Sequence, residues 1–110
     1  MASDSIRVVV FPEGAWWIGQ CLEHDIAAQA PTLPALYYEI DRLLVGRLIV
    51  AQERGVPPFK DLPQAPARFW RMFDQATLEL QPRRAPLPMP ADVRERMPAP
   101  EVRIAEPALA

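Results

Sequence analysis

The sequence predicts an α+β fold: a small antiparallel sheet of three strands packed against one long helix, then a short helix and a proline-rich extended tail. Apolar and β-branched residues in the first 30 positions form short runs separated by turn residues, which is typical of strands. Between positions 33 and 54 the apolar residues recur with helical spacing instead. Of the 14 prolines, 11 lie from Pro57 onward, and this density excludes a long regular helix there.

Three strands are predicted, at residues 6–11, 15–22 and 25–30. The first run, IRVVVF, is rich in β-branched residues, and Gly14 follows it in a tight turn because glycine tolerates a positive φ. The second run, AWWIGQCL, is largely apolar on both faces, with Trp16 on one and Trp17 on the other. We therefore expect a helix to cover one face of the sheet, and a partner chain or another segment of this chain to cover the second.

The long helix begins after Thr32, whose hydroxyl suits an N-cap, and Pro34 is tolerated in its first turn. It ends near Arg54, because Gly55 and a nearby proline form a helix stop. We expect Gly46 to mark a point of close contact, and the polar side chains to fall mostly away from the apolar face. The residues expected to face the sheet opposite Val8 and Val10 are Leu36, Ile40, Leu44 and Leu48.

The second half of the chain is predicted to add little to the sheet. Residues 57–64 resemble a linker, and residues 67–80 form a short helix that follows Pro66. We expect the tail to lie outside the core, with residues 102–105 docking as an added strand on an exposed sheet edge, for example that of a sister chain. The predicted units are a sheet-and-helix domain at 1–56, a linker and short helix at 57–81, and the tail at 82–110.

Four residues are candidates for a protein interface: Trp16, Trp17, Val102 and Ile104. Adjacent tryptophans on opposite strand faces cannot both point into one core, and tryptophan is enriched at protein contacts. Val102 and Ile104 are alternate side chains of the predicted docking strand. We expect a homo-oligomer, most simply a dimer.

The charge and composition of the chain exclude several classes of protein. The net charge of -2 leaves no overall basic surplus for nucleic acid, and a single cysteine excludes an internal disulfide. The start of the chain lacks the pattern of a signal peptide, and no apolar run is long enough to span a bilayer. We expect a cytoplasmic protein without membrane contact.

Cys21 and His24, the only cysteine and the only histidine, lie beside two acids, Glu23 and Asp25. A zinc site needs four ligands, usually in closely spaced pairs, and no second pair exists in the sequence. A nucleophilic cysteine needs an imidazole within hydrogen-bond reach, which an extended strand does not provide for this pair. We interpret Cys21 as a core residue and residues 23–25 as a solvated turn, and we predict no catalytic residue, metal or cofactor.

Two further kinds of active site, a nuclease and a hydrolase, also lack the residues that they need. A two-metal nuclease needs converging acids, but the first strand has none, and Glu39 and Asp41 point to different sides of the long helix. A hydrolase centred on His24 lacks a recognisable nucleophile motif. The aromatic residues favour a core and a protein interface, with a small-ligand or RNA-binding module as the alternative. Those aromatic residues are Trp16, Trp17, Tyr37, Tyr38, Phe69, Trp70 and Phe73.

Residues 6–54 resemble the HicB-type antitoxin domain of bacterial toxin–antitoxin pairs. The matching positions are Cys21, Leu22 and Glu23, then Asp25, Ile26 and Ala27, then Thr32 and Leu33. The resemblance implies a truncated ribonuclease-H-like fold without its catalytic acids, and a non-enzymatic module that binds a small basic toxin ribonuclease or itself. Members of that family usually carry a DNA-binding domain at the C-terminus. Residues 57–110 contain no second recognition helix, so we do not expect DNA binding.

Overall fold

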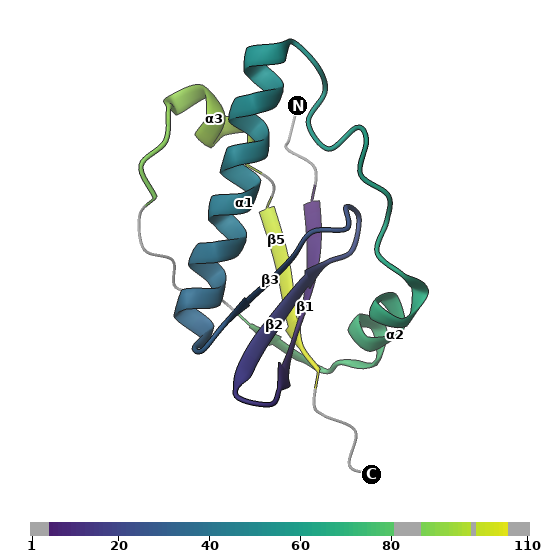
Figure 1. The fold of residues 1–110 in the computed structure, drawn as a ribbon. Coiled ribbons are helices and arrows are strands. Elements are labelled where there is room, and N and C mark those ends of the chain that lie inside the picture. The colour runs from purple at the N-terminus through teal and green to yellow at the C-terminus, as the bar shows by residue number, and fades with distance from the viewer. Residues whose placement is uncertain (1–4, 81–86, 98, 106–110) are drawn as a thin grey trace.

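The computed structural model describes residues 5–80, 87–97 and 99–105, and its long helix packs on a five-stranded mixed sheet (Figure 1). The predicted α+β class is therefore confirmed, but the sheet has two strands more than the three expected. The elements in chain order are β1 Ser5–Glu13, β2 Trp16–Cys21, β3 Ala27–Ala30, α1 Leu33–Arg54, α2 Ala67–Gln75, β4 Leu78–Leu80, α3 Ala91–Arg96 and β5 Ala99–Ile104.

The strands lie in the order β3-β2-β1-β5-β4. β1, β2 and β3 form an antiparallel meander, in which Gly14 closes the first turn with a φ of 59°. β5 pairs parallel to β1, with Val8 opposite Val102, and antiparallel to β4. β1 is therefore the central strand, and β3 and β4 are the two edges within the described residues.

The predicted limits of α1 are confirmed by its caps. The hydroxyl of Thr32 accepts a hydrogen bond from the backbone N–H of Ala35 at 3.2 Å, which satisfies one of the unpaired donors of the first turn. Gly55 adopts the left-handed conformation with a φ of 64°, and its N–H reaches the carbonyls of Ala51 and Gln52. Local sequence signals alone are thus sufficient to start and end this helix.

The apolar face of α1 lies on the sheet as predicted. Leu36, Ile40, Leu44 and Leu48 are buried in one cluster with Val8 and Val10 of β1. The close contact lies at Gly19 of β2, where an added Cβ would stand 2.7 Å from the Cδ1 atom of Ile40. Gly46 was expected to make such a contact, but a Cβ there would meet nothing within 4 Å, because this residue is on the outer face of α1. Asp41, expected on the polar side, is only 6% exposed.

The opposite face of the sheet is covered by α2, so the second apolar face is closed by another segment of the same chain (Figure 1). Val9 of β1 and Leu22 after β2 pack there against Phe73 of α2. β1 therefore places Val8 and Val10 under α1 and Val9 under α2, as the two-residue repeat of a strand requires. The expectation of a dimer was built on an uncovered face, and that reason no longer applies.

The tail prediction is wrong where the structure describes it. β5 lies between β1 and β4, and Val102 is 2% exposed inside the main cluster. The proline in this strand is tolerated because β4 does not extend to it. Among the described strands Pro100 pairs with β1 alone, and its missing N–H breaks no bond to β4. Residues 1–4, 81–86, 98 and 106–110 of the predicted units lie outside the described residues.

The second helix is also shorter than predicted. α2 ends at Gln75 rather than at residue 80, and residues 78–80 form β4. Leu78 and Leu80 pair in register with Ile104 and Val102, so a long-range partner converts the end of an apparent helix into a strand. Among the described helices, none combines the length and the apolar character needed to cross a membrane.

Candidate functional site

The stretch that holds Cys21 and His24 is part of the scaffold. The Cys21 side chain is fully buried under α1. The ring of His24 stacks on Phe59, with 4.5 Å between centroids. The carboxylate of Asp25 accepts a hydrogen bond from the Gln20 side chain at 2.8 Å. The turn is therefore solvated in part: Asp25 is exposed, while contacts from β2 and from the 55–61 loop hold the turn in place.

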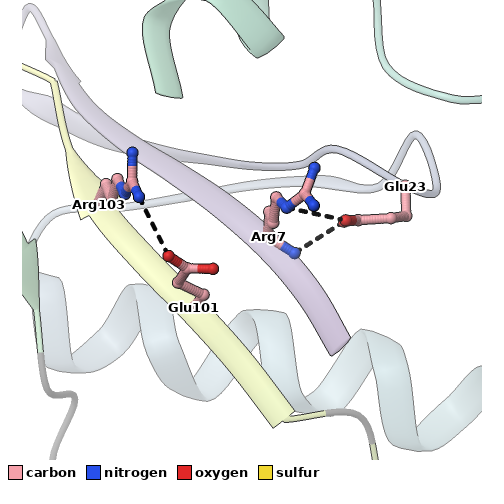
Figure 2. Close-up of polar contacts among 4 residues, drawn as sticks. All are labelled: Arg7, Glu23, Glu101 and Arg103. Atoms are coloured by element: carbon pink, nitrogen blue, oxygen red, sulfur yellow. Dashed lines mark hydrogen bonds and ion pairs between the residues drawn. The ribbon is translucent and has the colours of Figure 1, made fainter. Parts of the chain in front are cut away.

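Glu23 belongs to a set of charges on the face of the sheet that carries α2 (Figure 2). Its carboxylate accepts the backbone N–H of Arg7 at 2.7 Å and lies 3.6 Å from the guanidinium of the same residue. On β5 the guanidinium of Arg103 lies 3.3 Å from the carboxylate of Glu101. Each positive charge therefore has a negative partner, so the set as a whole presents no surplus of either sign.

The same two arginines hold α2 on the sheet. Arg7 lies over the ring of Trp70 at 5.4 Å, and Arg103 lies over the ring of Phe73 at 4.3 Å. Arg103 also donates a hydrogen bond to the Phe73 carbonyl at 3.2 Å. These contacts join residues far apart in the sequence, so no local pattern could indicate them. These contacts hold α2 on the sheet, and both arginine side chains make their interactions within the protein.

No group of three or more histidine, cysteine, aspartate or glutamate side chains gathers as a metal site within residues 5–80, 87–97 and 99–105.

The four interface candidates are separated by the structure. Trp16 is 46% exposed at the start of β2, on the face away from α1, whereas Trp17 is half-buried and packs against the main cluster. Val102 is in the core, and Ile104 is half-buried beside β4. Val102 is therefore inaccessible to a partner of this fold. Of the four, Trp16 is the one that presents a large exposed surface.

Trp16 lies close to the open edge formed by β3. The N–H of Cys21 donates a hydrogen bond to the carbonyl of Ile26, and β2 and β3 continue from there in antiparallel register. Because bonded and non-bonded pairs alternate in such a ladder, the backbone N–H and C=O groups of Ala27 and Gln29 point away from β2. β3 contains neither charge nor proline, the two usual means of blocking an edge. Exposed acids Glu13 and Asp25 flank it, and residues 13–31 contain no lysine or arginine. We call Trp16 with β3 the edge surface.

A second surface is a cavity of about 790 Å³ between the outer face of α1 and the 55–61 loop, which we call the α1 groove. Its apolar lining includes Leu43, Val50, Val56 and Pro57. Four basic residues and one acid also line it: Arg42, Arg47, Arg54, Lys60 and Asp61. Sequence analysis missed this site, because the loop that closes it was treated as a linker.

The loop side of the α1 groove is held by Phe59. This residue is buried, stacks on His24 and has a φ of 65°, a conformation that residues other than glycine rarely adopt. The carbonyl of Phe59 also accepts the N–H of Leu62 at 3.0 Å. A strained residue fixed by core contacts gives the loop one defined position beside the helix.

Comparison of the chain with protein-family models, with curated proteins and with solved structures found no match.

Proposed function

We propose that this protein is a non-enzymatic protein-interaction module, related in role to the HicB-type antitoxins, that binds a basic partner protein at its edge surface. The observation on which the proposal rests is the uncharged, proline-free strand β3 at the margin of the sheet, beside the exposed Trp16. An extended partner segment adds to such an edge through backbone hydrogen bonds, and an exposed tryptophan supplies an anchor.

Charge favours a basic partner over a second copy of this chain. Glu13 and Asp25 are exposed at the two ends of the edge surface, with no lysine or arginine between them. Opposite charges steer a basic segment to this edge, whereas two identical acidic edges repel one another. The resemblance to the antitoxin domain supports the same partner, a small basic toxin ribonuclease. A second copy of this chain is the alternative occupant of the edge surface, and the experiment below distinguishes it from a basic partner.

Support for a non-enzymatic role comes from the residues most suited to chemistry. The Cys21 sulfur belongs to the closed core, and the His24 ring lies against Phe59. The paired charges of Arg7 and Glu23 hold α2 and β1 in place. These groups are committed to the structure of the protein.

The test compares two synthetic peptides with the same alternating apolar residues, one with lysine and the other with glutamate between them. We expect the lysine peptide to shift the backbone amide signals of Ala27 and Gln29 in NMR titrations, and the glutamate peptide to leave them unchanged. Trp16→Ala should weaken binding, by roughly 2 kcal/mol if it is a hot spot.

Gln29 offers a matched pair of variants. Gln29→Pro removes an outward-pointing N–H and should abolish peptide binding. The fold should be retained, because the N–H of Gln29 makes no hydrogen bond to β2. Gln29→Thr keeps the N–H and should retain binding. Sedimentation equilibrium of the chain alone reports self-association separately. Equal binding of both peptides, or binding that survives Gln29→Pro, contradicts the proposal; a dimer that Gln29→Pro dissociates assigns the edge to a second copy instead.

A further inference from the structure

We propose that the α1 groove binds an anionic amphiphile, a small molecule with a single apolar chain and a carboxylate head. The groove and the edge surface are formed by different residues, so this inference is independent of the proposed function. The cavity of about 790 Å³ lies within the size range of pockets that hold small molecules. The groove has an apolar floor, a defined wall formed by the 55–61 loop, and positive charges that outnumber the one acid in its lining.

The floor of the groove exposes apolar surface that the described residues leave uncovered. Val50 is 44% exposed and Val56 is 47% exposed, and both line the cavity with Leu43. Gly46 lies between Leu43 and Val50 along the helix, and its missing side chain leaves open space above the backbone. Clustered apolar exposure of this kind favours binding of an apolar chain.

The rim of the groove is positively charged. Of its basic residues, Arg42 is engaged by Glu39 at 2.9 Å, and this hydrogen bond and charge raise the pKa of its guanidinium. Arg47 lies 3.8 Å from Asp61, in a pair that is exposed on both sides and therefore weak. Within the described residues, Arg54 and Lys60 form no ion pair. The groove therefore holds more positive than negative charge, which selects an anionic head.

The carbonyl end of α1 would repel an anion if it were left open. Here the N–H of Gly55 bonds the Gln52 carbonyl, and the N–H of Val56 bonds the Ala51 carbonyl at 3.0 Å. Arg54, the last residue of α1, and Lys60 of the 55–61 loop both line the groove. The carboxylate is therefore placed near Arg54 and Lys60, and the apolar chain extends along α1 toward Leu43.

The probe is dodecanoate, added to the full-length chain below its micelle concentration and followed by isothermal titration calorimetry. We expect one molecule bound per chain, with chemical-shift changes confined to α1 and the 55–61 loop. The same chain with a cationic head, dodecyltrimethylammonium, should bind weakly, and inorganic phosphate alone should not bind detectably, because each lacks one of the two required parts. The double variant Arg54→Gln with Lys60→Gln should lose roughly tenfold or more in affinity, whereas Arg71→Gln on α2 should lose none.

Gly46 provides the most selective variant. Gly46→Phe should fill the groove and abolish binding without entering the core, because a side chain there meets open space. Glu53→Phe adds the same ring at an exposed helix position that does not line the cavity, and should bind as the wild type does. Circular dichroism of each variant confirms folding, and Gly46→Ala supplies a second folded variant with a smaller side chain if Gly46→Phe is misfolded.

The inference would be overturned by equal affinity for the cationic amphiphile, by unchanged affinity in folded Gly46→Phe, or by shifts at the edge surface instead of the groove. Preference for an acidic peptide over dodecanoate would assign the groove to a protein partner and would also overturn it. Gln29→Pro should leave dodecanoate binding unchanged, so failure here and failure of the proposed function are separate outcomes.

Discussion

The two halves of this chain enter the same sheet in different ways. In residues 5–54, strands that are neighbours in the sequence are neighbours in the sheet, and each turn and cap is encoded within a few residues. In residues 67–105 the main strand, β5, pairs with β1 from the other end of the chain. The first half leaves one edge of β1 and one face of the sheet open, and the second half closes both with β5 and α2. Among the described strands this closure leaves two edges: the short strand β4, and β3 with the edge surface.

We expect the largest effect from a substitution that disrupts β5, the strand with which the second half closes the sheet. Val102→Asp places a carboxylate in the main core, where an unpaired charge is very costly, and we expect the protein to lose most or all of its stability, by more than about 4 kcal/mol. Leu78→Asp, on the neighbouring edge strand, is the control because Leu78 is 55% exposed. Urea denaturation measures both. Near-wild-type stability of Val102→Asp would show that β5 is dispensable, as a docking tail would be.

Loss of core packing in the first half should have the next largest effect. Ile40 is buried between α1 and the sheet, so Ile40→Ala should lower the free energy of unfolding by about 2 to 5 kcal/mol. Val50→Ala truncates a β-branched residue on the exposed face of the same helix and should change it by only about 0.5 kcal/mol. Equal losses in the two variants would mean that α1 is rotated from the orientation described.

Two glycines of the first half, Gly19 and Gly46, should respond to substitution in opposite directions. Gly19→Val forces new atoms against Ile40, where even a Cβ is too close, and should destabilise the protein by about 1 to 3 kcal/mol. Gly46→Ala adds a methyl group to open space on a helix and should stabilise it by up to about 1 kcal/mol. Thermal unfolding of both variants gives the sign of the change in stability. A change of the same sign in both would contradict the packing of β2 on α1.

The smallest expected effect is a pH dependence in the contact between the halves. The side-chain amide of Gln52 on α1 donates a hydrogen bond to the carboxylate of Asp92 on α3, and this bond lowers the pKa of that carboxyl. A lowered folded pKa stabilises the protein above the unfolded value, and the contribution is lost as the pH falls below about 4. Asp92→Asn should remove this part of the pH profile, together with the contribution that the carboxylate makes near neutrality. That contribution is small because Gln52 and Asp92 are both exposed. An unaltered acid profile would mean that the contact is absent in solution.

The contrast between the halves also explains what could be predicted from the sequence. Thr32, Gly55 and the spacing of the leucines predict α1 because caps and periodicity are local. β5 was not predicted as a core strand, because the fit of Pro100 depends on β4 ending before it, which only the assembled sheet shows. At the edge surface, the exposure of a tryptophan was predictable, but the choice of Trp16 over Trp17 depends on which face α1 covers. The α1 groove could not be predicted, because it is formed only when the 55–61 loop takes its position beside α1.

Amide hydrogen exchange of the isolated chain at low concentration shows whether β5 closes the sheet and whether β3 remains an open edge. The N–H of Ala105 donates to the Val10 carbonyl at 2.8 Å, and the N–H of Leu22 donates to the Arg7 carbonyl at 2.9 Å. We expect these two amides to exchange in the same slow class, near the rate set by global unfolding, and the outward amide of Gln29 to exchange rapidly. If Ala105 and the β5 amides instead exchange as fast as Gln29, the second half does not complete the sheet and the account is wrong.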